Sequence, residues 1–164
     1  MDFFSARFTI LFLTFLIFIS CETPKGEKNQ DSFASSPSPQ VVICNQKGEK
    51  IPLQVEIART EEQRKRGLMH REALGENQGM LFIMPYSGFH YFWMKNTPLS
   101  LDLIFIGEDL KIKEIVRKTL PESRARVGID QPSKYILEVK AGFADQHQLN
   151  PGDRVEFIGI EVKK

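Results

Sequence analysis

Two carboxylates occupy positions that the surrounding sequence marks as buried. Asp102 shares its face of the segment Leu99–Ile106 with isoleucines, and Glu138 follows the same pattern in the predicted strand Tyr135–Lys140. A carboxylate on an apolar face must be paired or must have a raised pKa. We therefore consider two roles: an acid and a base that act together, or structural groups that pair with a base or accept hydrogen bonds from loop amides.

Lys95 and Arg66 are plausible partners for these carboxylates. Lys95 and its neighbour Asn96 form a polar pair. They follow the apolar run Phe92-Trp93-Met94 and precede a proline turn, which brings both side chains close to apolar surface. Burial of such a group without a partner costs about 2–7 kcal/mol. We predict that Lys95 is held by Asp102 or Glu138, and that Asn96 hydrogen-bonds main-chain groups to fix the turn.

Aromatic residues gather just before this polar pair. Their spacing around a turn is compatible with packing in the core and equally with the aromatic wall of a groove. The residues involved are Tyr86, Phe89, His90, Tyr91 and Trp93. The candidate ligand-binding cleft then comprises His90, Trp93, Lys95, Asn96, Asp102 and Glu138.

Other patterns exclude several classes of function. No histidine or cysteine pair has the spacing of metal ligands, and the glycines form no phosphate-binding loop, so we expect neither a metal nor a cofactor. The net charge is +1 and the basic residues are dispersed, whereas a nucleic-acid partner requires a basic stripe.

The beginning of the chain resembles a secretory signal. The apolar run Phe8–Ile19 is shorter than the roughly 20 residues of a membrane-spanning helix and matches the core of a signal peptide. Ile19-Ser20-Cys21 then resembles a bacterial lipoprotein signal, in which cleavage exposes the cysteine for lipidation. We predict a signal peptide over residues 1–20 and a lipidated Cys21 that anchors the protein to a membrane of the cell envelope. An uncleaved anchor or an ordinary signal peptide is the alternative.

Composition divides the rest of the chain into a tether and one domain. Residues 21–40 are rich in Lys, Glu, Ser and Pro and bury too little apolar surface to fold, so we expect a flexible tether. Residues 41–164 have the size of one globular domain. If Cys21 carries lipid, Cys44 has no partner for a disulfide, and it is predicted to be a small buried hydrophobe.

Within the domain, short strands at close spacing predict a mainly β fold, a sandwich or barrel with one or two short helices. Thr60-Glu61-Glu62-Gln63 is a capping box, and Gly67 should end the helix that it begins. The expected strands are Val41–Cys44, Ile51–Ala58, Met80–Met84, Tyr91–Met94, Leu101–Ile106, Ile112–Arg117, Tyr135–Lys140 and Arg154–Val162. A second helical turn is expected at Ala144–Gln148, turns at Pro85–Gly88 and Asn96–Pro98, and a long irregular loop at Thr119–Ser133.

The motifs together resemble a known family. They are Thr60–Arg64, Gly67–Arg71, Gly79–Phe82, Phe92–Thr97 with Pro98-Leu99 and Leu101-Asp102, Leu137-Glu138 with Gly142, and Gly152-Asp153. In order and spacing this series is similar to the domain of unknown function 192 family. The resemblance implies a small, mainly β, sandwich-like fold and no known activity. The loop Arg124–Gln131 departs from the family pattern.

Two functions from different classes remain open. One is a non-enzymatic lipoprotein that binds a small ligand, a glycan or an envelope protein. The other is a small hydrolase or lyase that uses Asp102 and Glu138 with Lys95 or His90. Paired acid–base work needs both carboxylates in one cleft, about 5–9 Å apart. Capping of each carboxylate by backbone amides or a lysine would instead indicate a structural role.

Overall fold

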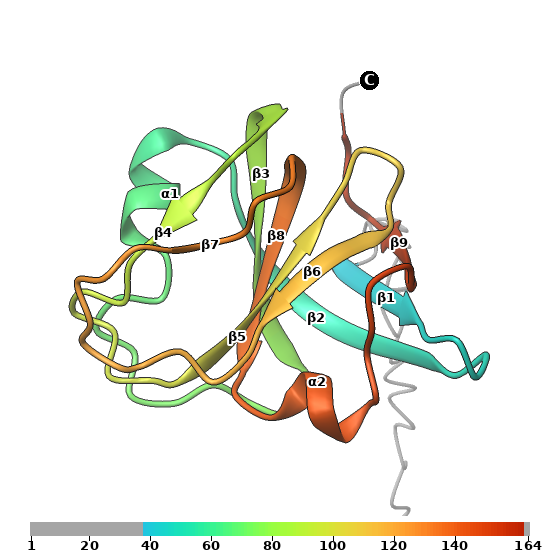
Figure 1. Cartoon of the computed structure of the whole chain (residues 1–164), viewed down its shortest axis with the longest axis horizontal. Helices are drawn as coiled ribbons and strands as arrows, with labels where there is room; N and C mark the ends of the chain where they lie inside the picture. The colour runs from blue at the N-terminus through green and yellow to red at the C-terminus, as the bar shows by residue number, and fades with distance from the viewer. Residues whose placement is uncertain (1–37, 163–164) are drawn as a thin grey trace, which may run out of the picture. The chain divides into compact units, whose positions relative to one another are not determined.

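The computed structural model describes residues 38–162. The predicted signal peptide, the lipidation site Cys21 and most of the tether therefore lie outside the described residues. The described part is mainly β-structure with two short helices (Figure 1), as the sequence predicted. The elements are β1 (Gln40–Cys44), β2 (Lys50–Ala58), α1 (Glu61–Arg66), β3 (Gln78–Gly88), β4 (Tyr91–Phe92), β5 (Leu101–Ile106), β6 (Ile112–Val116), β7 (Val127–Gly128), β8 (Ser133–Lys140), α2 (Phe143–Gln146) and β9 (Arg154–Ile158). No described helix is long and apolar enough to cross a membrane.

Seven strands form one curled sheet in the order β6-β5-β8-β3-β2-β1-β9. All neighbours are antiparallel except β2 and β3, whose parallel pairing needs the crossover that carries α1. The two edge strands approach each other through a bridge between Lys111 and Arg154 and hydrogen bonds such as Val155 N to Leu110 O at 2.8 Å. The sheet thereby closes on itself, which protects its edges.

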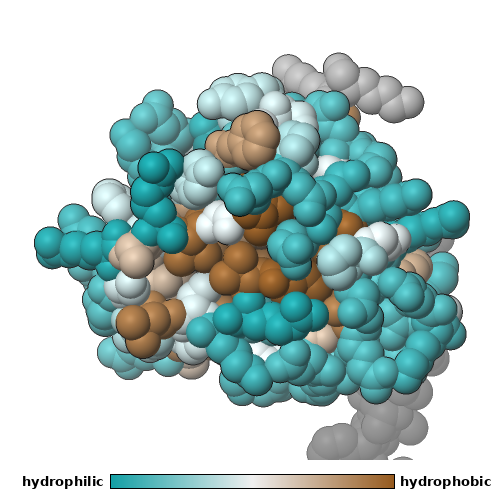
Figure 2. Space-filling view, viewed as in Figure 1, coloured by the Kyte–Doolittle hydropathy of each residue, from teal (hydrophilic) through white to brown (hydrophobic). Residues whose placement is uncertain are grey.

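Two separate hydrophobic clusters lie on the two faces of this sheet. The first takes residues from each of the seven strands and from α2, so it fills the inside of the curl. The second takes buried residues from β2, β3, β5 and β8 and from the loops that cross them, so it lies on the outer face. Figure 2 shows one side of the molecule, where hydrophobic residues near the centre are ringed by hydrophilic ones.

The local sequence explains the strands that were predicted well. In β2 the burial alternates strictly from Lys50 to Glu56, because only every second side chain faces the core. β5 is buried at all six positions, since one cluster covers each of its faces. Its hairpin with β6 and the β1–β2 hairpin both form as expected.

Helix α1 begins and ends where the sequence predicted. The Thr60 side chain accepts a hydrogen bond from Gln63 N at 3.2 Å, and the Gln63 side chain accepts one from Thr60 N at 2.9 Å. Gly67 has a φ of +47° and ends the helix, in a conformation that other residues rarely adopt. The capping box thus fixes a helix of six residues that buries none of its own side chains.

The predicted boundaries are wrong in several places. β3 continues to Gly88 through the predicted turn at Pro85–Gly88, because its far end pairs again with Ser133 beyond an irregularity. The strand predicted at Tyr91–Met94 has two residues and pairs with β7, which lies inside the predicted irregular loop. β9 ends at Ile158, and Cys44 is half-buried at the end of β1 rather than fully buried.

Candidate functional site

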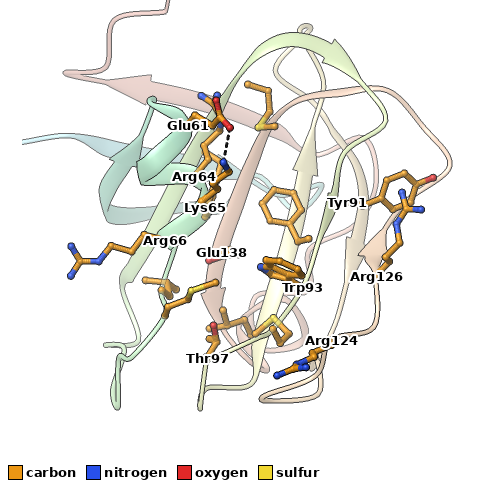
Figure 3. Close-up of a pocket in the computed structure, with 18 residues that line it drawn as sticks. Glu61, Arg64, Lys65, Arg66, Tyr91, Trp93, Thr97, Arg124, Arg126 and Glu138 are labelled. Carbon is orange, nitrogen blue, oxygen red and sulfur yellow. Dashed lines mark ion pairs between the residues drawn. The ribbon is translucent and has the colours of Figure 1, made fainter.

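A cavity of about 470 Å³ lies over the outer face of the sheet. Its size falls within the roughly 300–1,000 Å³ of small-molecule sites. The lining comes from α1 and the residues after it, from β3 and β8, from the segment around β4, and from the loop before β7 (Figure 3). The lining residues are Glu61, Arg64, Lys65, Arg66, Gly67, Leu68, Met69, Phe82, Met84, Tyr91, Phe92, Trp93, Met94, Thr97, Leu101, Arg124, Arg126 and Glu138.

Glu138 is the acidic group that the sheet presents to this cavity. It lies on β8 directly opposite Met80 of β3 and Leu103 of β5, both apolar. Only 6% of the residue is exposed, and within residues 38–162 its carboxyl has neither a hydrogen bond nor an ion pair. Burial alone raises the pKa of this carboxyl to about 8, because removal from water disfavours the charged form. At neutral pH the cavity therefore holds a carboxylic acid that can donate one hydrogen bond and accept another.

Asp102 lies on the opposite face of the sheet. It pairs in register with Val139, one residue past Glu138, and successive side chains of a strand point to opposite faces. Its oxygens accept hydrogen bonds from three backbone amides: Lys118 N at 2.8 Å, Gly142 N at 3.0 Å and Ala144 N at 3.0 Å. Asp102 thus ties α2 and the segment after β6 to β5. The two carboxylates do not share a cleft, so no acid–base pair is formed from them.

Apolar side chains make the walls of the cavity. Phe82 of β3 and Phe92 of β4 meet edge to face with ring centroids 5.2 Å apart, and Phe92 meets Phe105 at 6.1 Å. Such contacts hold the wall rigid. The methionines of the lining, among them Met84, can adapt to ligands of different shape. Trp93 is 52% exposed and presents an aromatic surface to the cavity.

The mouth of the cavity is basic. Five of its side chains are cationic and one besides Glu138 is acidic: Arg64, Lys65, Arg66, Arg124 and Arg126 against Glu61. Lys65 pairs with Glu61 at 2.7 Å, the dashed contact in Figure 3, and Arg126 lies 4.1 Å from the Tyr91 ring centroid. Arg64 donates to the carbonyl of Arg59. Arg66 and Arg124 have no acidic partner in the described part of the chain, and Arg66 points outward in Figure 3.

The structure separates the six residues of the predicted cleft. Trp93 and Glu138 line the cavity, whereas His90 is buried outside the lining. Its Nε2 donates a hydrogen bond to the main-chain carbonyl of Tyr86 at 3.2 Å. The predicted pairing of Lys95 with a carboxylate is wrong. Asp102 accepts hydrogen bonds from backbone amides, and within the described range Glu138 has no basic partner. The Lys95 ammonium instead lies 5.6 Å from the Trp93 ring centroid.

Asn96 fixes its turn differently from the prediction. Its φ is +55°, in the left-handed region that asparagine tolerates better than most residues. Its main-chain carbonyl accepts a hydrogen bond from His70 N at 2.7 Å, and Thr97 N donates to Met94 O at 3.1 Å. No hydrogen bond of the Asn96 side chain is formed within residues 38–162. Backbone conformation, rather than the amide group, makes this turn.

The sequence analysis missed most of the basic mouth. Arg64, Lys65 and Arg66 belong to the predicted short helix, where only Arg66 was considered as a partner for the carboxylates. Arg124 and Arg126 belong to the predicted irregular loop. They meet because the β4–β7 pair draws the loop back toward α1 across the outer face. The departure of residues 124–131 from the family pattern was the one available signal. Among residues 38–162 no group of three or more histidine, cysteine or acidic side chains could hold a metal ion.

Comparison with known proteins identifies the family. The model of domain of unknown function 192 (DUF192), described as an uncharacterized ACR, matches residues 42–157. The chain belongs to the DUF192 family. A search of curated proteins finds no match. The DUF192 assignment agrees with the resemblance read from the sequence motifs.

Two crystal structures resemble this DUF192 chain over most of the described residues. One, from Sinorhizobium meliloti, is described as a candidate transcription regulator. It is 36% identical to this chain with a TM-score of 0.72, and the match spans 74% of this chain and 95% of the other. The other is a protein of unknown function from Novosphingobium aromaticivorans. It is 32% identical with a TM-score of 0.69, and the match spans 71% of this chain and 83% of the other. Both structures share the mainly β fold.

Proposed function

We propose that this DUF192 protein is a cell-envelope lipoprotein whose domain binds a small ligand, without catalysis, in the cavity at Glu138. The observation that carries the proposal is the carboxyl of Glu138, which is almost fully buried, has no partner in the described chain and faces a cavity of ligand size. A buried polar group without a partner is costly, and a ligand that hydrogen-bonds it would remove that cost.

The catalytic alternative finds less support in the geometry. It requires Asp102 and Glu138 in one cleft, and they lie on opposite faces of the sheet. His90 and Lys95 are absent from the cavity lining, so neither is placed to act with Glu138. A glycan or an envelope protein could meet the exposed aromatic rim, but the enclosed carboxyl favours a small molecule.

Trp93 offers a direct test, because it is the only tryptophan of the chain and lines the cavity. N-phenyl-1-naphthylamine (NPN), an uncharged aromatic probe, should quench Trp93 emission saturably when added to the full chain in a nonionic detergent. Met84→Glu, which places a charge on the half-buried wall, should weaken this quenching severalfold. The matched surface change Phe89→Ser lies outside the lining and should leave it unchanged. Quenching that never saturates, or that Met84→Glu does not alter, would refute binding in the cavity.

The envelope location is tested separately. The apolar run Phe8–Ile19 and Ser20-Cys21 support a lipid anchor at Cys21. Cells that express the full chain and are fed a clickable fatty acid should label it, and a Cys21→Ala variant should take up none. An equal signal from both forms would contradict lipidation at this cysteine and leave the cavity proposal untouched.

A further inference from the structure

The cavity has three chemically different zones, and together they define a ligand class. The zone at the sheet holds the Glu138 carboxyl between Met80 and Leu103, and among residues 38–162 no cation pairs with it. The middle zone is apolar and aromatic. The outer zone carries five basic side chains against the single Glu61.

The outer zone selects for charge. Lys65 is neutralised by Glu61, and Arg126 is held over the ring of Tyr91. Arg66 and Arg124 are exposed and free of acidic partners in the described range. They come from α1 and from the loop before β7 and lie apart in Figure 3, so an anion at the mouth lies in the positive potential of both without contacting both at once. A ligand whose only charge is positive would be repelled there.

The inner zone selects for a neutral polar group. A second negative charge beside Glu138 would have no cation to balance it, whereas an uncharged carbonyl, hydroxyl, ether or amine can exchange a hydrogen bond with a protonated carboxyl. The charged or titratable groups that face Glu138 across the cavity are Glu61, Arg64, Lys65 and Arg66 on α1, Tyr91 on β4, and Arg124 and Arg126 on the loop. None of them contributes to the raised pKa of Glu138, which burial alone produces.

We propose that the cavity takes an organic anion with an apolar body. Its acidic group lies at the basic mouth, where Arg66 and Arg124 are the cations without acidic partners in the described range, and its neutral polar group hydrogen-bonds Glu138. This assignment rests on the proposed binding function and names its ligand class. The apolar body fills the space between Phe82, Phe92 and Trp93. An amphiphile with one charged end matches the order of the three zones.

The test compares two probes that differ by one anionic group. 8-Anilinonaphthalene-1-sulfonate (ANS) is NPN with an added sulfonate, and both are followed through Trp93 quenching in the full chain with nonionic detergent. ANS should bind about three- to tenfold more tightly than NPN, the gain expected from attraction to two exposed charges. The double variant Arg66→Gln/Arg124→Gln should remove this preference by weakening ANS binding more than NPN binding. Lys47→Gln, in the β1–β2 turn, is the matched control and should change neither.

A pH series tests the inner zone. Between pH 6 and pH 9 the wild-type affinity for ANS should fall severalfold as Glu138 ionises, and Glu138→Gln should abolish that fall. Naphthylmethylammonium serves as a cationic probe. If it binds more tightly than ANS, or if ANS and NPN bind equally in every variant, the anionic class is overturned while cavity binding stands. If neither ANS nor NPN quenches Trp93 saturably, the proposed function itself fails.

Discussion

Asp102 and Glu138 are both buried carboxylates on adjacent strands, yet their surroundings differ completely. Asp102 is 0% exposed and accepts three backbone hydrogen bonds inside the curl of the sheet. Glu138 is 6% exposed and meets apolar side chains and the cavity on the outer face. Burial by itself therefore does not distinguish a structural carboxylate from a binding group. The partners do, and a buried acid without partners marks the surface on which a ligand is expected.

The largest expected effect is the loss of Asp102. Asp102→Ala removes the acceptor for three amides, each worth about 1–3 kcal/mol when left unsatisfied, so we expect a destabilisation of about 3–5 kcal/mol. Urea unfolding followed by circular dichroism measures it, with the exposed Asp130→Ala as the control. A loss under about 1 kcal/mol would mean that the three amides find other partners.

Glu138 should behave in the opposite way, and its effect should depend on pH. The pKa of the Glu138 carboxyl is about 8 in the folded protein, above the usual 4.5 of an unfolded chain. The free energy of unfolding is therefore at its full value below pH 4.5, where both states hold the proton. It falls as the pH rises toward 8, because the unfolded chain ionises first. Glu138→Gln should match the wild type near pH 4.5 and exceed its stability by on the order of 4 kcal/mol at pH 8. Unfolding curves across this window measure the difference, with the exposed Glu161→Gln as the control. Parallel curves for wild type and Glu138→Gln would show that the carboxyl has an unnoticed partner.

The cap of α1 should have an intermediate effect confined to the Glu138 face. Thr60→Ala removes the hydrogen bond to Gln63 N and should cost about 1 kcal/mol. Because α1 carries Arg64, Lys65 and Arg66, the same change should also weaken ANS binding through the mouth of the cavity. Thermal unfolding and Trp93 quenching measure the two effects, and Thr60→Ser should restore both. Unchanged ANS binding in Thr60→Ala would show that the helix does not position the basic side chains.

The smallest effect is expected at Lys95. If Lys95 held either carboxylate, its removal would cost about 3–5 kcal/mol. Within residues 38–162 the only interaction that the structure shows for its ammonium group is with the exposed Trp93 ring, worth about 0.5–1 kcal/mol, so Lys95→Met should cost no more than that. Urea unfolding beside the turn variant Lys47→Met measures it. Severe destabilisation would support the pairing of Lys95 with a carboxylate that the sequence predicted, and Glu138 would then no longer differ from Asp102 in lacking a partner.

Residues close in the sequence were predicted well because local physics decides them. The capping box at Thr60, the stop at Gly67 and the alternation in β2 each depend on contacts within a few residues or on one buried face. The mainly β class followed from the number and spacing of such segments, which left a sandwich and a barrel open; the contacts between the two edge strands decide that the sheet closes. The DUF192 resemblance depended on motifs that are themselves local.

What only the tertiary structure decided is which side chains share a space. The sequence marked Asp102 and Glu138 alike, because each lies among apolar neighbours on its own strand. The register of β5 against β8 sends them to opposite faces, and the crossing of α1 and the β4–β7 pair places basic groups from distant segments around one of them. Pairing register and long-range crossings depend on the whole set of packed strands, so no window of sequence contains them.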